Sequence, residues 1–414
     1  MVDVVDNRAP GVRLQVVASL PAPVLDTGVP VFVGLWRREP PAALTDLARA
    51  LGIGDGFLPP YGPVSLNAAT WTSLDAVFGN TWAGGMLGPA LRGFFANGGR
   101  RCHVLLHGQG GLGEALQKLE AFEDFDLVCA PDSAGNTQDH VAILGLCGRR
   151  PGCFALLDGV GSSVPNPALN ADSFITGAQA IQQNASPALC INAALLGPWL
   201  KVRRACSTCN GTGCPTCGGT GDAFVPPSGH IAGIASRFDQ KIGPHRAPAN
   251  EPLEGVLDVQ VAFGDSSLSG LNGRGVIPIR ALPGRGIRAW GARTLAPNDG
   301  NFSHVNVRRT YLTILRFLEF VAADLAFELN EFRLWLRVQR EVSAFLEELR
   351  VAGAFYGESA TEAYYVKCDE ETNPPELREN GIVAAEIGVS IAKPNEFIIV
   401  RLMTGASGIA GTGG

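Results

Sequence analysis

Long apolar runs are missing from this sequence. No stretch of about 18 or more apolar residues is free of charged residues or proline, so the sequence predicts no membrane-spanning helix. The opening residues, Met1 to Asp6, include acids where a signal peptide requires basic residues, and no apolar segment follows them. We therefore expect a chain that assembles in the cytoplasm and does not insert directly into a membrane.

Basic charge is also scarce. The chain has 33 Lys and Arg against 39 Asp and Glu, a formal net charge of -6. Its basic clusters are as short as Arg203–Arg204 and Arg308–Arg309, whereas a nucleic-acid-binding surface needs a broad basic patch. We therefore expect no nucleic-acid partner. Hydrophobic residues make up 46 % of the 414 residues, which is typical of a folded chain with room for two or three domains.

Common catalytic motifs are missing as well. The six histidines show neither H-E-x-x-H nor a nearby G-x-S-x-G, although a Ser/His/Asp or Cys/His set could still assemble from distant residues. The strongest catalytic lead is Gly108–Gly113, which fits G-x-G-x-x-G after an apolar run. Because another strand precedes it and 52 glycines make a chance match easy, we interpret it as a tight turn. We predict that the protein is not an enzyme; a nucleotide-dependent α/β enzyme using Gly108–Gly113 is the alternative.

Ten cysteines are present, and without a signal peptide the reduced or metal-bound state is favoured. Six lie scattered, mostly in apolar runs, and are interpreted as buried small hydrophobic residues: Cys102, Cys129, Cys147, Cys153, Cys190 and Cys368. The other four form two tandem C-x-x-C-x-G-x-G units: Cys206, Cys209, Cys214 and Cys217. Four thiolates can close a tetrahedral site without an open position. The sequence therefore predicts a structural zinc ion (Zn2+) in a small hairpin insert at 205–221, with two disulfides as the alternative.

This cysteine unit resembles the zinc-binding repeat of DnaJ-type chaperones over 16 residues. That resemblance leaves a zinc-dependent adaptor as a further alternative function. It would predict client binding and small oligomers.

Apolar runs and helical segments alternate between residues 29 and 190. The runs are Val29–Leu35, Cys102–Leu106, Leu127–Ala130 and Cys153–Leu157. The helical segments are Leu74–Phe78, Met86–Asn97, Gly113–Phe122 and Gln138–Cys147. Continuous apolar strands separated by helices are typical of a mostly parallel sheet covered on both faces. The sequence therefore predicts an α/β fold for this part.

The C-terminal half has a different pattern. A region dense in Gly and Pro runs from Val225 to Asn298, with short strands expected at Val256–Phe263 and Ile287–Trp290. Two helices are expected, Val305–Ala322, capped by Asn301 or Ser303, and Glu331–Val351. The expected strands after them are Ala363–Cys368, Ile382–Ile391 and Glu396–Met403, before a flexible tail.

Two strands, one near each end of the chain, have no obvious local partner. Val12–Ala18 stands between prolines, and Glu396–Met403 lies close to the C-terminus. A strand without a local partner needs a distant segment or another chain to pair with.

Several short segments in the C-terminal half together resemble a known family. They include Val225–Ile234, His245–Asn250, Gly284–Leu295, Val305–Arg309, Phe327–Asn330, Val366–Asp369 and Pro394–Phe397. In this order they are similar to the tail-sheath family of contractile phage tails and extracellular injection systems. The resemblance is dense over about 225–403 and extends loosely to Gly28–Gly34, Phe94–Gly99, Leu127–Asp132 and Pro198–Leu200. The cysteine insert is a departure from the family pattern.

The resemblance implies a structural subunit that polymerises as stacked helical hexameric rings around an inner tube and contracts to drive the tube through a target envelope. It implies four parts: an N-terminal arm (1–20), an outer α/β domain (21–224), an α+β inner sheath-core domain (225–395) and a C-terminal arm with tail (396–414). The arms would add strands to neighbouring subunits through Val12, Leu14, Val16 and Val17, and through Glu396, Phe397, Ile398, Ile399 and Val400.

Further partners follow from the same resemblance. They are other copies of the chain, six to a ring, the inner tube protein, and baseplate and terminal cap proteins. The particle would assemble in the bacterial cytoplasm and be released by lysis or docked at the membrane. A short chain without large surface insertions favours an injection system over a phage tail.

Overall fold

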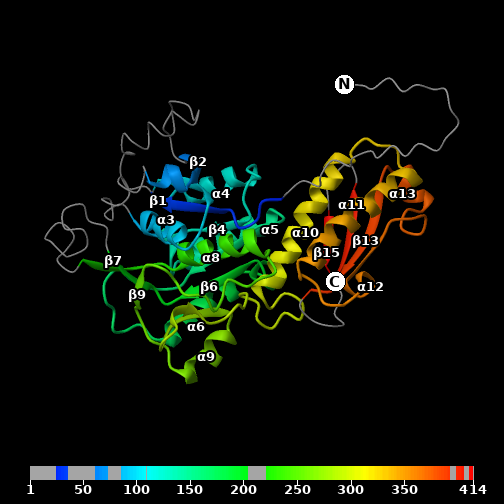
Figure 1. The fold of residues 1–414 in the computed structure, drawn as a ribbon. Coiled ribbons are helices and arrows are strands. Elements are labelled where there is room, and N and C mark those ends of the chain that lie inside the picture. The colour runs from blue at the N-terminus through cyan, green and yellow to red at the C-terminus, as the bar shows by residue number, and fades with distance from the viewer. Residues whose placement is uncertain are drawn as a thin grey trace, which may run out of the picture.

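The computed structural model describes residues 25–35, 61–72, 85–108, 110–203, 221–391, 398–404 and 410–413. Its main element is an eight-stranded sheet with the order β11-β10-β6-β5-β4-β1-β3-β2 (Figure 1). The strands are β1 (Pro30–Leu35), β2 (Tyr61–Asn67), β3 (Arg101–His107), β4 (Leu127–Cys129), β5 (Phe154–Asp158), β6 (Ala193–Gly197), β10 (Val276–Leu282) and β11 (Gly286–Ala289). Only the outermost strands, β2 and β11, run antiparallel to their neighbours in this sheet.

Helices cover both faces of this sheet because successive strand residues point to opposite sides. Val31 and Val33 pack into one buried cluster and Phe32 into the other. The first face carries α4 (Leu112–Glu120), α5 (Thr137–Arg149), α6 (Ala171–Asn184), α7 (Pro187–Cys190) and α9 (Asp265–Asn272). The second carries α3 (Leu87–Ala96), α8 (Ser228–Lys241) and α10 (Val305–Asp324). A one-turn 3-10 helix, η2 (Pro131–Ser133), follows β4.

A small three-stranded sheet, β8-β7-β9, lies beside the main sheet. Its strands are β7 (Leu200–Arg203), β8 (Asp222–Val225) and β9 (Val256–Val259). β7 and β8 are antiparallel, and Arg203 is the direct partner of Asp222. The segment between them, which carries the predicted zinc insert, therefore leaves and rejoins the body at one place.

A second, four-stranded antiparallel sheet lies at the other end of the molecule (Figure 1). Its order is β12 (Tyr364–Lys367), β13 (Val383–Val389), β14 (Ile398–Thr404) and β15 (Ala410–Gly413). The helices α11 (Phe332–Val351), α12 (Ala360–Ala363) and α13 (Pro375–Glu379) accompany it.

One hydrophobic core joins the two sheets. A single cluster of buried residues runs from Phe32 in the main sheet through Phe317 on α10 to Ile387 on β13. Phe317 and Phe345 stack with ring centroids 3.8 Å apart, which joins α10 to α11. The four-stranded sheet and helices α11 to α13 form what we call the C-terminal part. Helix α10 therefore packs against both the main sheet and the C-terminal part.

Several expectations from the sequence are confirmed. The main sheet is mostly parallel and covered on both faces. The helices expected at Met86–Asn97, Gly113–Phe122, Gln138–Cys147, Val305–Ala322 and Glu331–Val351 correspond to α3, α4, α5, α10 and α11. Leu74–Phe78 lies outside the described residues.

Other expectations differ from the structure. The main sheet continues past residue 224, because β10 pairs in parallel with β6, and the division of the chain into four parts stays a prediction. The expected cap of α10 is wrong: His304 occupies the N-cap position without a side-chain cap, and Ser303 Oγ is 3.0 Å from His304 Nδ1 instead.

Helix α8 was not expected in the Gly- and Pro-rich region. Its glycines are needed because α8 packs very closely on α3. A Cβ atom at Gly229 would stand 2.1 Å from the carbonyl oxygen of Ala90.

Candidate assembly site

A doubly wound sheet binds ligands at its topological switch point, which lies here between β1 and β4. Asp132, just after β4, occupies this position. Its Oδ2 accepts a hydrogen bond from the Leu35 amide at 3.0 Å, and its Oδ1 accepts one from the Met86 amide at 2.6 Å. The carboxylate thus holds the end of β1 and the start of α3 together, which is a structural role.

The Gly108–Gly113 turn follows β3, one strand away from the switch point. It opens α4, as the sequence predicted, and Gly110 has a left-handed φ of 78°. His107 Nδ1 lies 2.8 Å from the carbonyl oxygen of Gly108, which fixes the start of the turn. These features favour a tight turn, and its position differs from that of a dinucleotide fingerprint after the first strand.

A Ser/His/Asp set does assemble. Ser65 Oγ is 2.9 Å from His103 Nδ1, and His103 Nε2 is 3.3 Å from Asp124 Oδ2. The carboxylate of Asp124 also accepts two hydrogen bonds from the guanidinium of Arg101, and burial lowers the pKa of His103. In the hydrolase triad the carboxylate holds Nδ1 and the nucleophile faces Nε2, so the order here is reversed. The set ties β2 to β3.

A buried charge cluster joins three elements. The Arg309 guanidinium, on α10, donates to Asp239 of α8 at 3.0 Å and to Asp126 at 3.1 Å. Asp126 also accepts from the amides of Gly28 at 3.0 Å and Val29 at 2.7 Å. Burial raises the pKa of Asp239, and the Arg309 charge opposes that shift. The cluster anchors the entry to β1 against α8 and α10.

The predicted metal ligands Cys206, Cys209, Cys214 and Cys217 lie outside the described residues. Within the part of the chain that the structure describes, no group of three or more His, Cys, Asp or Glu side chains could hold a metal ion. The zinc site stays a prediction. The described helices also include none that is long and apolar enough to cross a membrane.

The predicted strand of the N-terminal arm (Val12, Leu14, Val16, Val17) also lies outside the described residues, as do Glu396 and Phe397. Ile398, Ile399 and Val400 begin β14 and pair with Val389, Gly388 and Ile387 of β13 in the same chain. The expectation that this strand lacks a local partner is therefore wrong. Its donation to a neighbouring copy stays a prediction.

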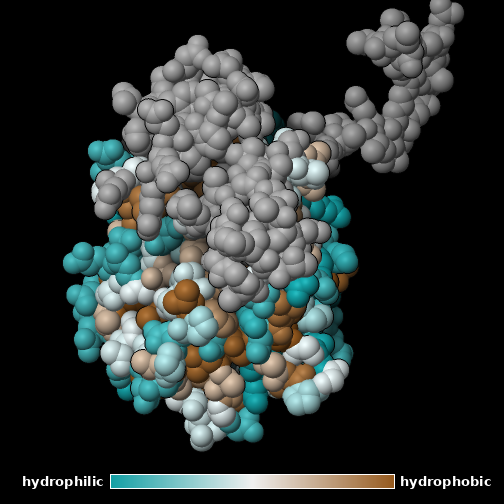
Figure 2. Space-filling model, turned by 90° about the vertical axis from the view of Figure 1, so that its left-hand side faces the viewer, coloured by the Kyte–Doolittle hydropathy of each residue, from teal (hydrophilic) through white to brown (hydrophobic). Residues whose placement is uncertain are grey.

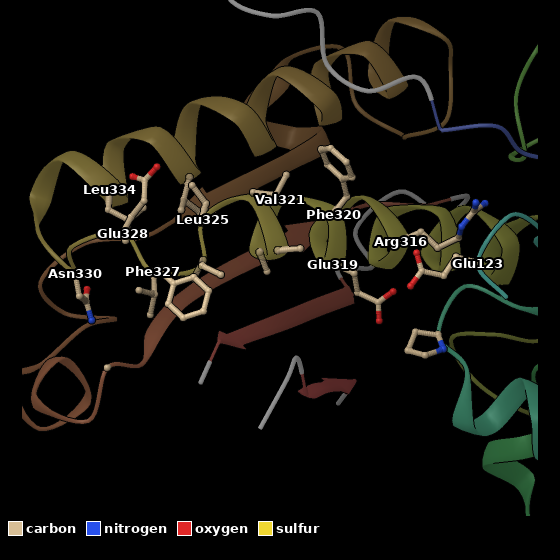
Figure 3. A pocket seen from close by; sticks show the side chains of 18 of the residues that line it. Glu123, Arg316, Glu319, Phe320, Val321, Leu325, Phe327, Glu328, Asn330 and Leu334 are labelled. Atoms are coloured by element: carbon tan, nitrogen blue, oxygen red, sulfur yellow. The ribbon is translucent and has the colours of Figure 1, made fainter. Parts of the chain in front are cut away.

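A groove of about 1190 Å³ lies at the junction of the main sheet and the C-terminal part (Figure 3). We call it the junction groove. One wall is the turn at Arg149–Pro151 with Glu120 and Glu123, and the other is the end of α10 with the loop after it and part of β13. Leu25, the first described residue, also lines it.

Large apolar side chains are exposed in the junction groove. Phe327 has a relative exposure of 107 %, Leu329 of 78 % and Phe320 of 47 %. Phe327 also has a φ of 72°, a left-handed conformation that is rare for a bulky residue. Figure 3 shows Glu123 close to Arg316 at the other end of the groove. An apolar surface rimmed by charges is typical of an interaction site. No sequence signal singled out this groove, because its walls come from distant segments.

Figure 2 shows the end of the molecule that lies away from the four-stranded sheet. Hydrophobic residues reach the surface there between hydrophilic ones. Leu257 on β9 and Val164, whose carbonyl oxygen accepts from Gln260 Nε2 at 3.0 Å, have exposed side chains. Hydrophobic surface is therefore present near β9 as well as in the junction groove.

Residues 108–295 match the family model of the phage tail sheath protein central domain. No curated protein matches the sequence. Among solved structures, the sheath complex of PVC, an extracellular contractile injection system, in its contracted state is 24 % identical over 98 % of this chain and 99 % of that chain, with a TM-score of 0.67. A chain from the contracted baseplate of the anti-feeding prophage is 24 % identical over 96 % and 97 %, with a TM-score of 0.70.

The helical sheath of the anti-feeding prophage in its contracted state is also similar, at 23 % identity over 95 % of this chain and 98 % of that chain, with a TM-score of 0.64. These likenesses concern the fold of the whole chain, whereas the family match concerns the sequence of its central part. The chain thus carries the central domain of the phage tail sheath family within the fold of contractile sheath proteins, which confirms the resemblance to the contractile tail-sheath family.

Proposed function

We propose that this chain is the structural subunit of a contractile sheath, in which hexameric rings stack helically around an inner tube and contract to drive it through a target envelope. The observation that carries the proposal is the sheath fold, shared over almost the whole of both chains with the PVC sheath in its contracted state. The proposal is of a structural role, in which Asp132 at the switch point is bound by backbone amides and Gly110 supplies the left-handed φ of a turn.

Strand exchange is the proposed link between copies. Among the described strands, β12 and β15 are the outer ones of the four-stranded sheet, and outer strands are where a strand from another copy can be added. Each backbone hydrogen bond contributes about 0.5–1.5 kcal/mol net, so an arm of six or seven residues could tether neighbours while the bodies between them move. Val12–Ala18 and the segment from Glu396 to Met403 are the proposed arms, and for the second, pairing with a neighbour would replace the pairing of β14 with β13 and β15 of its own chain.

The remaining partners and the particle's location follow from the sheath proposal. Baseplate and terminal cap proteins would contact the ends of the polymer, and the inner tube would contact the C-terminal part. The particle would assemble in the bacterial cytoplasm and act after release by lysis or while docked at the membrane. Since the compared structures come from extracellular contractile injection systems, an injection particle is the favoured type.

A zinc ion in the cysteine insert is a separate proposal. The paired ends Arg203 and Asp222 support a hairpin that projects from the body. Elemental analysis of the purified chain should find one zinc ion per chain that is lost when Cys206 and Cys209 are replaced by serine. Zinc-free native protein would overturn this proposal without touching the sheath proposal.

Negative-stain electron microscopy tests the sheath function. The chain is expressed together with a candidate inner tube protein, and striated rods are expected. Deleting Val12–Ala18 should abolish the rods while the subunit keeps its unfolding temperature, because the arm holds neighbours rather than the core. The matched control replaces the same segment with another strand-forming sequence of equal length, which should restore rods through backbone pairing. Discrete globular particles under every condition would contradict the proposal.

A further inference from the structure

Two buried cysteines face each other beside the junction groove. Cys147 lies in the last turn of α5, and Cys153 directly precedes β5. Their sulfur atoms are 3.4 Å apart, and their residues are 3 % and 0 % exposed. Both are free thiols.

The distance is short enough for a covalent bond after a small adjustment. A disulfide has a sulfur–sulfur distance of about 2.05 Å, so the two atoms need to approach by roughly 1.4 Å. Five residues separate the two cysteines: Gly148 and Arg149 end α5, Arg150 is half-buried, Pro151 is exposed and Gly152 is buried. Rotation of the two cysteine side chains, with a slight shift of Arg150 and Pro151, can bring the sulfurs together.

The turn between the cysteines is also a wall of the junction groove. Arg149, Arg150 and Pro151 line that groove. Gly152 rests on α10, since a Cβ atom there would stand 2.1 Å from Cγ of Arg316. The Arg150 guanidinium lies 3.9 Å from the centroid of the Phe125 ring. A bond between the two sulfurs would therefore fix the wall against α10.

We propose that Cys147 and Cys153 form a thiol–disulfide site that sets the rigidity of this groove wall. One thiol, as its thiolate, attacks hydrogen peroxide and becomes a sulfenic acid as the peroxide O–O bond breaks. The sulfur of the second thiol then displaces water from the sulfenic acid. In total two thiols and one hydrogen peroxide give one disulfide and two waters, so the sulfurs are oxidised and the peroxide is reduced.

The redox state of the two thiols is expected to differ between the cytoplasm and the outside of the cell. The hydrogen bond between Cys147 and Cys153 and burial raise the pKa of Cys147, whereas the charges of Arg150 and Arg308 act in the opposite direction. The thiolate is therefore scarce and oxidation is slow, so a reducing cytoplasm keeps both thiols reduced. Outside the cell no such reductant opposes the reaction. The site itself does not depend on the proposed sheath function; only the timing of its oxidation does.

Peptide mapping of the purified full-length chain tests the site. The protein is treated with hydrogen peroxide, denatured, alkylated and digested with trypsin, which cleaves after Arg149 between the two cysteines. A crosslink holds the two resulting peptides together, with the loss of two hydrogen atoms, until a reducing agent separates them. The oxidised chain should also unfold roughly 2–4 °C higher than the reduced chain.

Variants supply the controls. Cys147→Ser and Cys153→Ser should each abolish the linked peptides, whereas Cys190→Ala, at an equally buried cysteine, should keep them. Mapping by peptide separates the pair from the four cysteines at 206–217. Independent alkylation of Cys147 and Cys153 after peroxide treatment of the wild type would overturn the proposal, as would a crosslink of either to another cysteine. The wild-type measurement decides the question even if a variant fails to fold.

Discussion

Arg309 shows how much the stability of this chain depends on single buried charges. Its side chain is 3 % exposed and is shared between two buried carboxylates, Asp126 and Asp239. Replacing it leaves two carboxylates without a countercharge in the core. We expect Arg309→Met to lower the free energy of unfolding by about 3–5 kcal/mol in urea titrations.

The matched control is Arg337, which also contacts several acids but lies on the surface. It pairs with Asp324, Glu328 and Glu341, and its side chain is 31 % exposed. Because exposed pairs are screened by solvent, Arg337→Met should cost below about 1 kcal/mol. Equal losses for the two variants would show that the buried cluster has no special role.

His140 predicts a pH dependence of stability. Burial lowers its pKa to about 4, and within the described residues its Nε2 has no hydrogen-bond partner. His140 takes up a proton near pH 6.5 in the unfolded chain but only near pH 4 in the folded chain. The stabilisation that neutral His140 gives the folded chain is therefore fully present above pH 6.5 and is lost as the pH falls towards 4. Relative to wild type, His140→Leu should therefore gain stability over this range, on the order of 1–3 kcal/mol at pH 4.

Urea unfolding of both chains at pH 7 and pH 4.5 measures the effect. The comparison is needed because burial raises the pKa of Asp158 to about 7, which acts in the opposite direction over the same pH range. The difference between wild type and variant isolates His140. A difference that stays constant with pH would contradict the prediction.

At the scale of elements, the junction groove carries the most exposed large apolar side chain among the described residues, Phe327. Phe327 extends into solvent in a strained conformation, and such a residue is kept where a partner covers it. If the partner is a second copy of the chain, Phe327→Ser should shorten or abolish rods in electron micrographs. The unfolding temperature should stay within about 2 °C of wild type, because an exposed side chain contributes little to the core.

The control for Phe327 is Val351→Ser. Val351 is 73 % exposed at the end of α11 and does not line the groove. It should leave rods unchanged. Rods of normal length from Phe327→Ser would rule out a groove contact between copies.

Elements with strong local signals were predictable from the sequence. β1, β4 and β5 are continuous apolar runs, and α10 and α11 show a helical stripe, so local pattern sufficed. Helix α8 was missed because Gly229 and Gly233, which allow close contact with α3, weaken the helical signal. The pairing of β14 with β13 was missed because a strand near the terminus does not reveal its partner.

The candidate site was less accessible to sequence reasoning than the fold. The family could be recognised from short ordered segments, and the central-domain match over residues 108–295 agrees with it. The junction groove instead depends on which turn meets α10 in space. The sulfur pair was also hidden, because Cys147 and Cys153 each look like an ordinary buried residue.

At the scale of the whole molecule, the continuous core determines which parts of the subunit can move relative to one another. Phe32, Phe317 and Ile387 belong to one buried cluster, so the main sheet and the C-terminal part share apolar contacts through α10. Changes in subunit contacts would then involve the outer strands and the groove rather than the interior. This favours a body that moves as a unit.

The ladder between β7 and β8 has a practical consequence. Arg203 and Asp222 face each other at its last rung, at the end of the molecule away from the four-stranded sheet. A peptide whose own ends lie close together can be spliced between them without stretching the body. This position is therefore a natural point for a fluorescent label or affinity tag, carried far from the sheet that the arms are proposed to join.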